Sequence, residues 1–226
     1  YPAGMKTILC YGDSNTWGMN PETGGRFPRE RRWPTVLAQE LGADYEVIAE
    51  GLNARTTVHP DPIKGGDKSG IAYLGPCLES HHPLSLVVIM LGTNDLKRRF
   101  RQLATEIAMG AARLVQTVQR CGYGPGGRAP AVLLVAPPPV GTLTNLAAVF
   151  EGAEETSRAL AEAYREQAEL LGCAFLDAGR FVQSSDLDGI HLEADAHRTL
   201  GEAVARHVRD LPLRDVSSEA LRPRPT

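Results

Sequence analysis

The chain has 226 residues, a length that fits one α/β domain and can bury a core without disulfides or metals. Hydrophobic residues make up 42% and charged residues 23%, which is typical of a soluble globular protein. Lys and Arg number 24 against 27 Asp and Glu, a net charge of −3. This balance argues against nucleic acid or an anionic membrane as the main partner.

The four cysteines are far apart and form no CxxC pair, which excludes a zinc pattern and a dense disulfide framework. We expect them to be reduced thiols in a cytoplasmic protein. No stretch has the apolar length of a membrane span, and no secretory signal is visible before Met5.

Hydrophobic periodicity predicts alternating strands and helices along the chain. Short apolar runs predict strands over residues 7–11, 45–49, 84–91, 131–135 and 174–176. Helical spacing predicts helices over 33–41, 69–80, 103–118, 155–171 and 194–211, although Gly75 and Pro76 weaken the second.

This alternation predicts a flavodoxin-like three-layer α/β/α sandwich with a five-stranded parallel sheet. We assign residues 5–211 to a single domain. Residues 1–4 are interpreted as a cloning remnant and 212–226 as a C-terminal tail. Ligands of such sheets bind beyond the carboxyl ends of the strands.

Three polar clusters fall at that edge. Gly12–Trp17 follows the first strand and carries Ser14. The Ser14 hydroxyl either faces a ligand at this edge or only caps a helix. Gly92–Asp95 follows the strand at 84–91, and its Asn94 amide either donates to an oxyanion or only forms a turn.

The third cluster, Asp188–His191, precedes the last helix. Its carboxylate can orient the imidazole so that the ring accepts a serine proton, but a DxxH sequence alone also occurs in surface turns. Together the clusters offer a nucleophile, a base, an orienting acid and an oxyanion donor, which is the set that an activated serine needs.

These residues resemble the SGNH hydrolases, also called GDSL esterases. Three segments match the family blocks in order: GDSN at Gly12–Asn15, GTND at Gly92–Asp95 and DGIH at Asp188–His191. The departure is after the second strand, where Ala54 stands at the position of the oxyanion glycine. A backbone N–H fills that role, so alanine can serve if its φ and ψ are allowed.

The resemblance implies a serine esterase with Ser14 as nucleophile and His191 and Asp188 as its proton-handling pair. The oxyanion hole would be formed by the Ser14 and Ala54 amides and the Asn94 side chain, with Gly51 as the alternative to Ala54. No metal or cofactor is implied, and the substrate would be a small acyl ester.

Longer strings such as GDSNTWG and VVIMLGTNDLK resemble the arylesterase/acyltransferase branch. Its members are small, cytosolic and often oligomeric, so we expect a homo-oligomer. Some transfer acyl groups to alcohols or peroxide in water, which leaves acyltransferase or perhydrolase activity as the alternative.

Seven further residues near these motifs are candidates for the substrate pocket, although each is equally explained by ordinary packing. They are Asp13, Trp17, Leu52, Thr93, Lys97, Phe150 and Ile190. We expect no metal at His81-His82, because adjacent side chains rarely face one ion.

The basic clusters at 29–32 and 97–101 are interpreted as a solvated face or subunit salt bridges, with contact to an acidic substrate as an alternative. A rival hypothesis of another class is a phosphate- or nucleotide-binding module. Against this hypothesis, the chain contains neither GxGxxG nor GxxxxGK[ST], the motifs typical of such modules. A catalytically dead relative used as a scaffold is disfavoured, because every triad position is filled.

Overall fold

The computed structural model of the chain describes residues 4–216. Its strands are β1 (Lys6–Gly12), β2 (Tyr45–Gly51), β3 (Leu86–Met90), β4 (Ala131–Ala136) and β5 (Ala174–Asp177). Its α-helices are α1 (Ser14–Trp17), α2 (Trp33–Leu41), α3 (Gly70–His81), α4 (Ala104–Arg120), α5 (Ala153–Leu171) and α6 (Ala194–Arg209).

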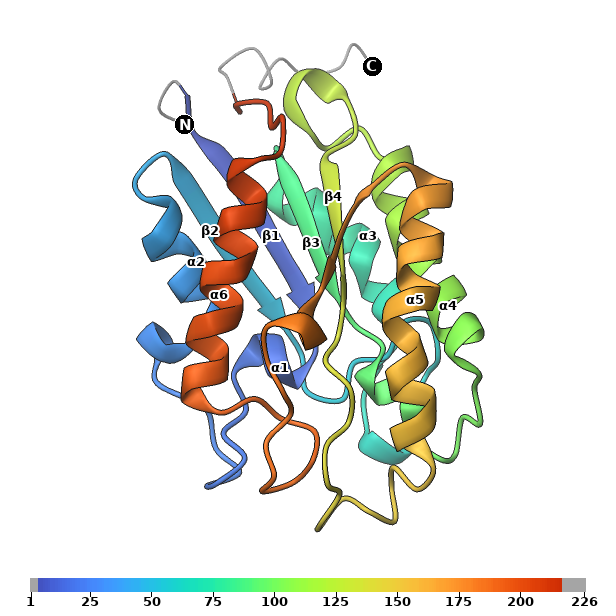
Figure 1. Cartoon of the computed structure of the whole chain (residues 1–226). Helices are drawn as coiled ribbons and strands as arrows, with labels where there is room; N and C mark the ends of the chain where they lie inside the picture. The colour runs from blue at the N-terminus through green and yellow to red at the C-terminus, as the bar shows by residue number, and fades with distance from the viewer. Residues whose placement is uncertain (1–3, 217–226) are drawn as a thin grey trace.

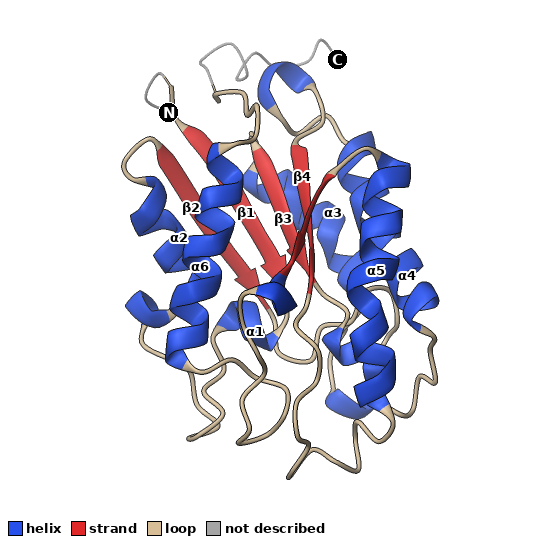
Figure 2. Ribbon diagram, viewed as in Figure 1, coloured by secondary structure: helices blue, strands red, loops and turns tan. Residues whose placement is uncertain are grey.

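The five strands form one parallel sheet in the order β2-β1-β3-β4-β5, with helices on both faces (Figures 1 and 2). This confirms the predicted fold class. The central strand β3 is covered on both faces, since each of its five residues is apolar and buried. Val87 and Ile89 face the core under α3, α4 and α5, whereas Leu86, Val88 and Met90 face the core under α2 and α6.

The predicted elements are found with small shifts at their ends. Pro76 lies inside α3 without ending it, and its ring lies on the exposed side of the helix. The predicted strand at 84–91 is shorter than expected: Leu84 and Ser85 precede β3, although their amides still bond to Tyr123 and Thr7. The turn α1 was not predicted as a helix.

Two glycines bring α1 directly against the carboxyl edge of the sheet (Figure 1). Gly12 and Gly51 pair at the ends of β1 and β2. A Cβ on Gly12 would lie 2.0 Å from the Thr16 hydroxyl, and one on Gly51 would lie 2.1 Å from the Trp17 amide. Only residues without a side chain let α1 pack this closely, so these glycines fix where Ser14 lies.

Within residues 4–216, no helix is both long and apolar enough to span a bilayer. The predicted cloning remnant lies outside the described residues apart from Gly4, as does the C-terminal tail from residue 217 onward. The described end of that tail returns to the start of β1, where the Val216 amide donates to the Met5 carbonyl.

His197 on α6 is fully buried against α2, where the Trp33 amide donates to its Nδ1 at 3.4 Å. Burial lowers the pKa of His197 from 6.5 to about 4, and repulsion by His191 and Arg32 adds to this shift. Its imidazole therefore stays neutral in the folded protein at pH values where it is charged in the unfolded chain.

We expect stability to fall between about pH 6.5 and 4, because the unfolded chain there binds a proton that folded His197 does not. The loss amounts to on the order of 3 kcal/mol, at about 1.4 kcal/mol per pKa unit. His197→Asn keeps an acceptor for the Trp33 amide and removes the titration. Urea unfolding between pH 7.5 and 4.5 should therefore give a flatter profile for the variant. Parallel profiles would show that His197 is not the source.

Candidate active site

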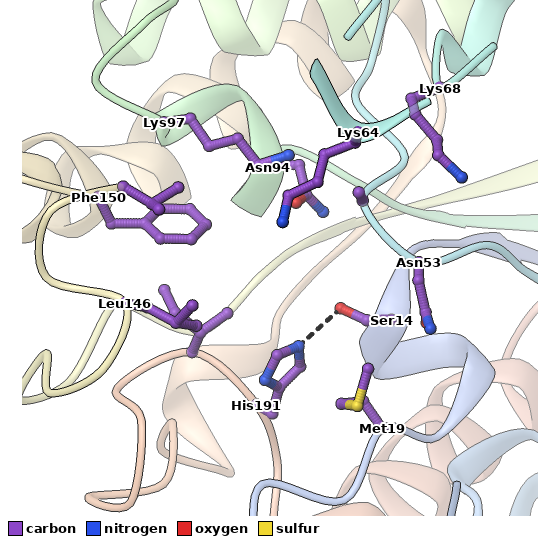
Figure 3. Close-up of a pocket in the computed structure, with 13 residues that line it drawn as sticks. Ser14, Met19, Asn53, Lys64, Lys68, Asn94, Lys97, Leu146, Phe150 and His191 are labelled. Carbon is purple, nitrogen blue, oxygen red and sulfur yellow. Dashed lines mark hydrogen bonds between the residues drawn. The ribbon is translucent and has the colours of Figure 1, made fainter. Parts of the chain in front are cut away.

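The three polar clusters converge at the carboxyl edge of the sheet. Ser14 is the first residue of α1, and its Oγ lies 3.0 Å from Nε2 of His191, 177 positions further along the chain (Figure 3). His191 Nδ1 lies 2.6 Å from Asp188 Oδ2. The structure thus brings the predicted serine, imidazole and carboxylate into one hydrogen-bonded chain.

The Asp188 carboxylate is held from both sides. Its Oδ1 accepts the amides of Ile190 and His191 at 2.8 and 2.9 Å, while Oδ2 faces the imidazole. Burial raises the pKa of Asp188, but the bonds from the imidazole and the two amides outweigh burial and leave the pKa below its usual value. The carboxylate therefore stays ionised and can stabilise a protonated imidazole. Gly189, at φ 80°, makes the turn between them.

The side chain of Asn15 joins α1 to the histidine loop. Its Nδ2 donates to the Ile190 carbonyl at 3.2 Å, and its Oδ1 accepts the Leu192 amide at 3.0 Å. These two backbone groups flank His191. The side chain next to Ser14 therefore holds the loop that carries His191, a role that the sequence analysis did not assign.

The predicted oxyanion donors surround the same serine. Asn94 is buried, and its Nδ2 lies 3.5 Å from Asp13 Oδ2. Ala54 has φ 68°, in the left-handed region that favours glycine. Within residues 4–216, the amides of Ser14 and Ala54 have no hydrogen-bond acceptor, so both are free to receive a ligand. Gly51, the alternative, instead packs under Trp17.

Two buried ionisable residues hold these donor loops in place. Asp95 accepts the Thr57 amide at 2.9 Å and the Thr57 hydroxyl, so it ties the loop of Ala54 to that of Asn94. Burial raises the pKa of Asp95 to about 7. Arg55 donates to the Gly12 carbonyl at 2.9 Å, with its guanidinium over the Tyr11 ring.

A pocket of about 310 Å³ opens in front of Ser14 (Figure 3). The predicted site residues that line it are Ser14, Ala54, Asn94, Lys97, Phe150, Ile190 and His191. Further lining residues, not anticipated from the sequence, are Met19, Asn53, Lys64, Lys68, Leu146 and Val149. They come from loops whose path no local pattern specifies.

Four predicted pocket residues lie outside this lining. Asp13 caps α1 by accepting the Asn15 amide at 2.9 Å, and burial raises its pKa. Trp17 carries the Arg26 guanidinium over its ring. The Leu52 amide donates to the Gly12 carbonyl, and Thr93 is buried at the start of a 3₁₀ turn. Each of these four residues has a capping or packing role, which is the alternative that the sequence analysis gave for them.

One group of described residues has metal-ligand atoms close together, with Glu50, Cys77 and His81 within 4.8 Å of one another. His81 Nε2 is already bonded to Glu50 at 2.8 Å. The buried cation of Arg55 lies nearby, since its guanidinium donates to the Glu50 carbonyl. A neighbouring cation disfavours a metal ion. His82 turns away and stacks on Tyr123.

The basic cluster at 97–101 forms ion pairs inside the chain. Arg98 pairs with Glu151 on the exposed surface, whereas Lys97 and Arg99 pair with the buried Asp61. This cluster is therefore a solvated face only in part. In the cluster at 29–32, Arg32 donates to the Phe27 carbonyl.

Comparison with known proteins gives a consistent result. The model of the GDSL-like lipase/acylhydrolase family matches residues 10–199. A carbohydrate acetylesterase family member from Sinorhizobium meliloti is 42% identical, covers 91% of this chain and 98% of its own, and superposes with a TM-score of 0.87. The aryl esterase of M. smegmatis is 44% identical, with 91% and 99% covered and a TM-score of 0.85. Comparison with curated proteins finds no matching sequence.

The position of Asn15 gives a test of how the site is held together. In Asn15→Asp, the donor to the Ile190 carbonyl becomes a repelling oxygen, which should shift His191 relative to Ser14. A displacement of about 1 Å at a catalytic group costs on the order of 10²-fold. We therefore expect kcat on a p-nitrophenyl ester to fall by about that factor, with KM changed only a few-fold.

The matched control is Asn20→Asp, which keeps the acceptor for the Glu22 amide and should retain activity. Melting temperatures check that both variants are folded. A folded Asn15→Asp protein with kcat within twofold of wild type would show that this bridge does not position the histidine.

Proposed function

Because the chain belongs to the GDSL-like lipase/acylhydrolase family, we propose that it is a serine esterase that hydrolyses small acyl esters. The observation that carries this proposal is the hydrogen-bonded chain from Ser14 through His191 to Asp188, at the wall of a pocket. Aryl esterase and acetylesterase structures above 40% identity support ester hydrolysis as the reaction.

In the proposed mechanism, Ser14 Oγ attacks the ester carbonyl while His191 Nε2 accepts its proton. Asp188 stabilises the imidazolium. The developing oxyanion is bound by the Ser14 and Ala54 amides and by Asn94 Nδ2. His191 then donates its proton to the leaving alcohol, which leaves an acyl group on Ser14.

A water molecule then attacks the acyl group while His191 accepts a proton from the water. The acid is released when His191 returns that proton to Ser14 Oγ. An alcohol or peroxide in place of water would make the same intermediate a donor for acyl transfer. The apolar side chains of Leu146, Val149 and Phe150 support this second reaction, because they favour an organic nucleophile beside the acyl-enzyme.

We also propose that the protein is cytoplasmic and forms a homo-oligomer. The four cysteines are free thiols, which supports a reducing compartment. The homo-oligomer is proposed from the resemblance of the motifs to the arylesterase/acyltransferase branch. Exposed apolar side chains such as Leu103, Met109 and Leu170 are available for a contact between subunits.

The nucleophile is tested by comparing wild type with Ser14→Ala. We expect the variant to lose nearly all hydrolysis of p-nitrophenyl acetate, because no other group in this arrangement can form the acyl-enzyme. A fluorophosphonate probe should label wild type at Ser14, and peptide mapping would locate the adduct. Near-wild-type hydrolysis by purified Ser14→Ala would refute the assignment.

The size of the pocket predicts a preference for short acyl groups. Phe150 and Leu146 crowd a cavity of about 310 Å³, so a long chain must remain in water. We expect kcat/KM for p-nitrophenyl acetate to exceed that for the decanoate by at least about tenfold. A long chain that displaces Phe150 or Leu146 costs on the order of 1–3 kcal/mol, and about 1.4 kcal/mol is tenfold in rate.

Phe150→Ala should narrow this ratio by enlarging the cavity, whereas the exposed substitution Leu170→Ala should leave it unchanged. A higher rate on decanoyl than on acetyl esters in wild type would contradict the assignment of a short acyl pocket.

A further inference from the structure

The chain contains only four lysines, and three of them line the pocket in front of Ser14. These are Lys64, Lys68 and Lys97. No Asp or Glu is among the lining residues. The rest of the chain uses arginine for its positive charge, and the fourth lysine, Lys6, lies at the start of β1, at the opposite edge of the sheet.

The loop that carries two of these lysines is firmly anchored. The Thr56 amide donates to the Lys68 carbonyl at 2.9 Å, and the Ser69 hydroxyl donates to the Val58 carbonyl. Asp61 in the same loop is fully buried and receives Lys97 Nζ at 2.8 Å and Arg99 at 3.2 Å. The loop is thereby fixed to the segment that follows Asn94.

Asp61 receives both cations on its Oδ2, while its buried Oδ1 has no hydrogen-bond partner among the described residues. Burial raises its pKa, but the bond and charge of Lys97, with the charge of Arg99, outweigh burial and lower the pKa. The pKa of Lys97 is lowered, mainly by burial and in part by the charges of Arg99 and Lys64, which Asp61 only partly offsets. One carboxylate oxygen therefore faces two paired cations, and the charge of Lys64 is among the causes that lower the pKa of Lys97.

Lys64 and Lys68 have no acidic partner of their own. Neither forms an ion pair with a carboxylate of residues 4–216. The nearby acids are engaged elsewhere: Asp67 accepts the Ser69 amide, and Asp188 holds His191. Figure 3 shows Lys64 reaching from its loop toward Asn94 and Ser14, and Lys68 above Asn53. Two uncompensated ammonium groups thus face an otherwise largely apolar pocket.

We propose that this site selects esters that carry a negative charge, such as a carboxylate close to the scissile bond, with Lys64 and Lys68 as the residues that determine the preference. The inference rests on the proposed esterase function. The lysines attract and orient the anion at the pocket mouth, while Ser14 attacks the ester carbonyl in the same way as in a neutral substrate.

Two matched pairs of esters test this preference. In the first pair, 4-acetoxybenzoate carries a charged leaving group and methyl 4-acetoxybenzoate a neutral one. In the second, p-nitrophenyl hemisuccinate carries a charged acyl group and p-nitrophenyl butyrate a neutral one. We expect a higher kcat/KM for the anionic member of at least one pair, mainly through a lower KM.

The ratio of kcat/KM for anionic over neutral ester should fall by about two- to fivefold in Lys64→Met and in Lys68→Met, as expected for exposed ion pairs. It should fall further in the double variant, and Lys64→Glu should reverse the preference. The matched control, Lys6→Met, removes a lysine outside the pocket and should leave the ratio unchanged.

Salt gives an independent measurement. The Debye length falls from about 10 Å at 0.1 M to about 3 Å at 1 M salt, so the preference should shrink over that range in wild type and less in the double variant. Equal ratios in wild type and the double variant, for both pairs, would overturn the inference. Loss of the esterase function itself would appear differently, as no Ser14-dependent hydrolysis of the neutral esters.

Discussion

The side chain of Asn15 is the contact on which the rest of the site depends. It bonds the carbonyl and the amide on either side of His191, and it follows directly after Ser14. Two segments 177 positions apart are thereby held within hydrogen-bond distance. The donor loops are fixed in the same manner, since Asp95 bonds Thr57 across 38 positions. Buried polar side chains bonded to backbone thus hold together loops that the sheet only brings near one another.

Sequence predicted the fold because each strand and helix carries a strong local signal. The apolar run of β3 and the spacing of Leu200, Val204 and Val208 on α6 both reflect burial that is now visible. The proposed triad could be predicted because its residues lie in short motifs, one at a strand end and one before the last helix. No sequence signal separated pocket residues from neighbours such as Asp13 and Trp17, because capping and packing use the same residue types.

The pocket wall was predicted only in part, for a different reason. Phe150 and Ile190 lie beside motifs or elements, whereas Met19, Asn53 and Lys64 reach the pocket through turns that depend on tertiary contacts. Lys64 precedes Gly65 and Gly66, both at positive φ, which signals a turn but not its direction. The direction is set by the buried pair of Asp61 and Lys97, and a pairing between residues 36 positions apart cannot be read from either segment alone.

Ala54 is one of two non-glycine residues in the described chain with positive φ. Its left-handed backbone costs about 1–2 kcal/mol relative to glycine. A methyl group also removes many of the orientations that a glycine peptide would sample. In the proposed oxyanion hole, the amide of Ala54 would therefore be kept near one direction before any substrate arrives, and less ordering entropy would be lost when negative charge develops in front of it. The strained backbone conformation of Ala54 would in this way preorganise the proposed donor.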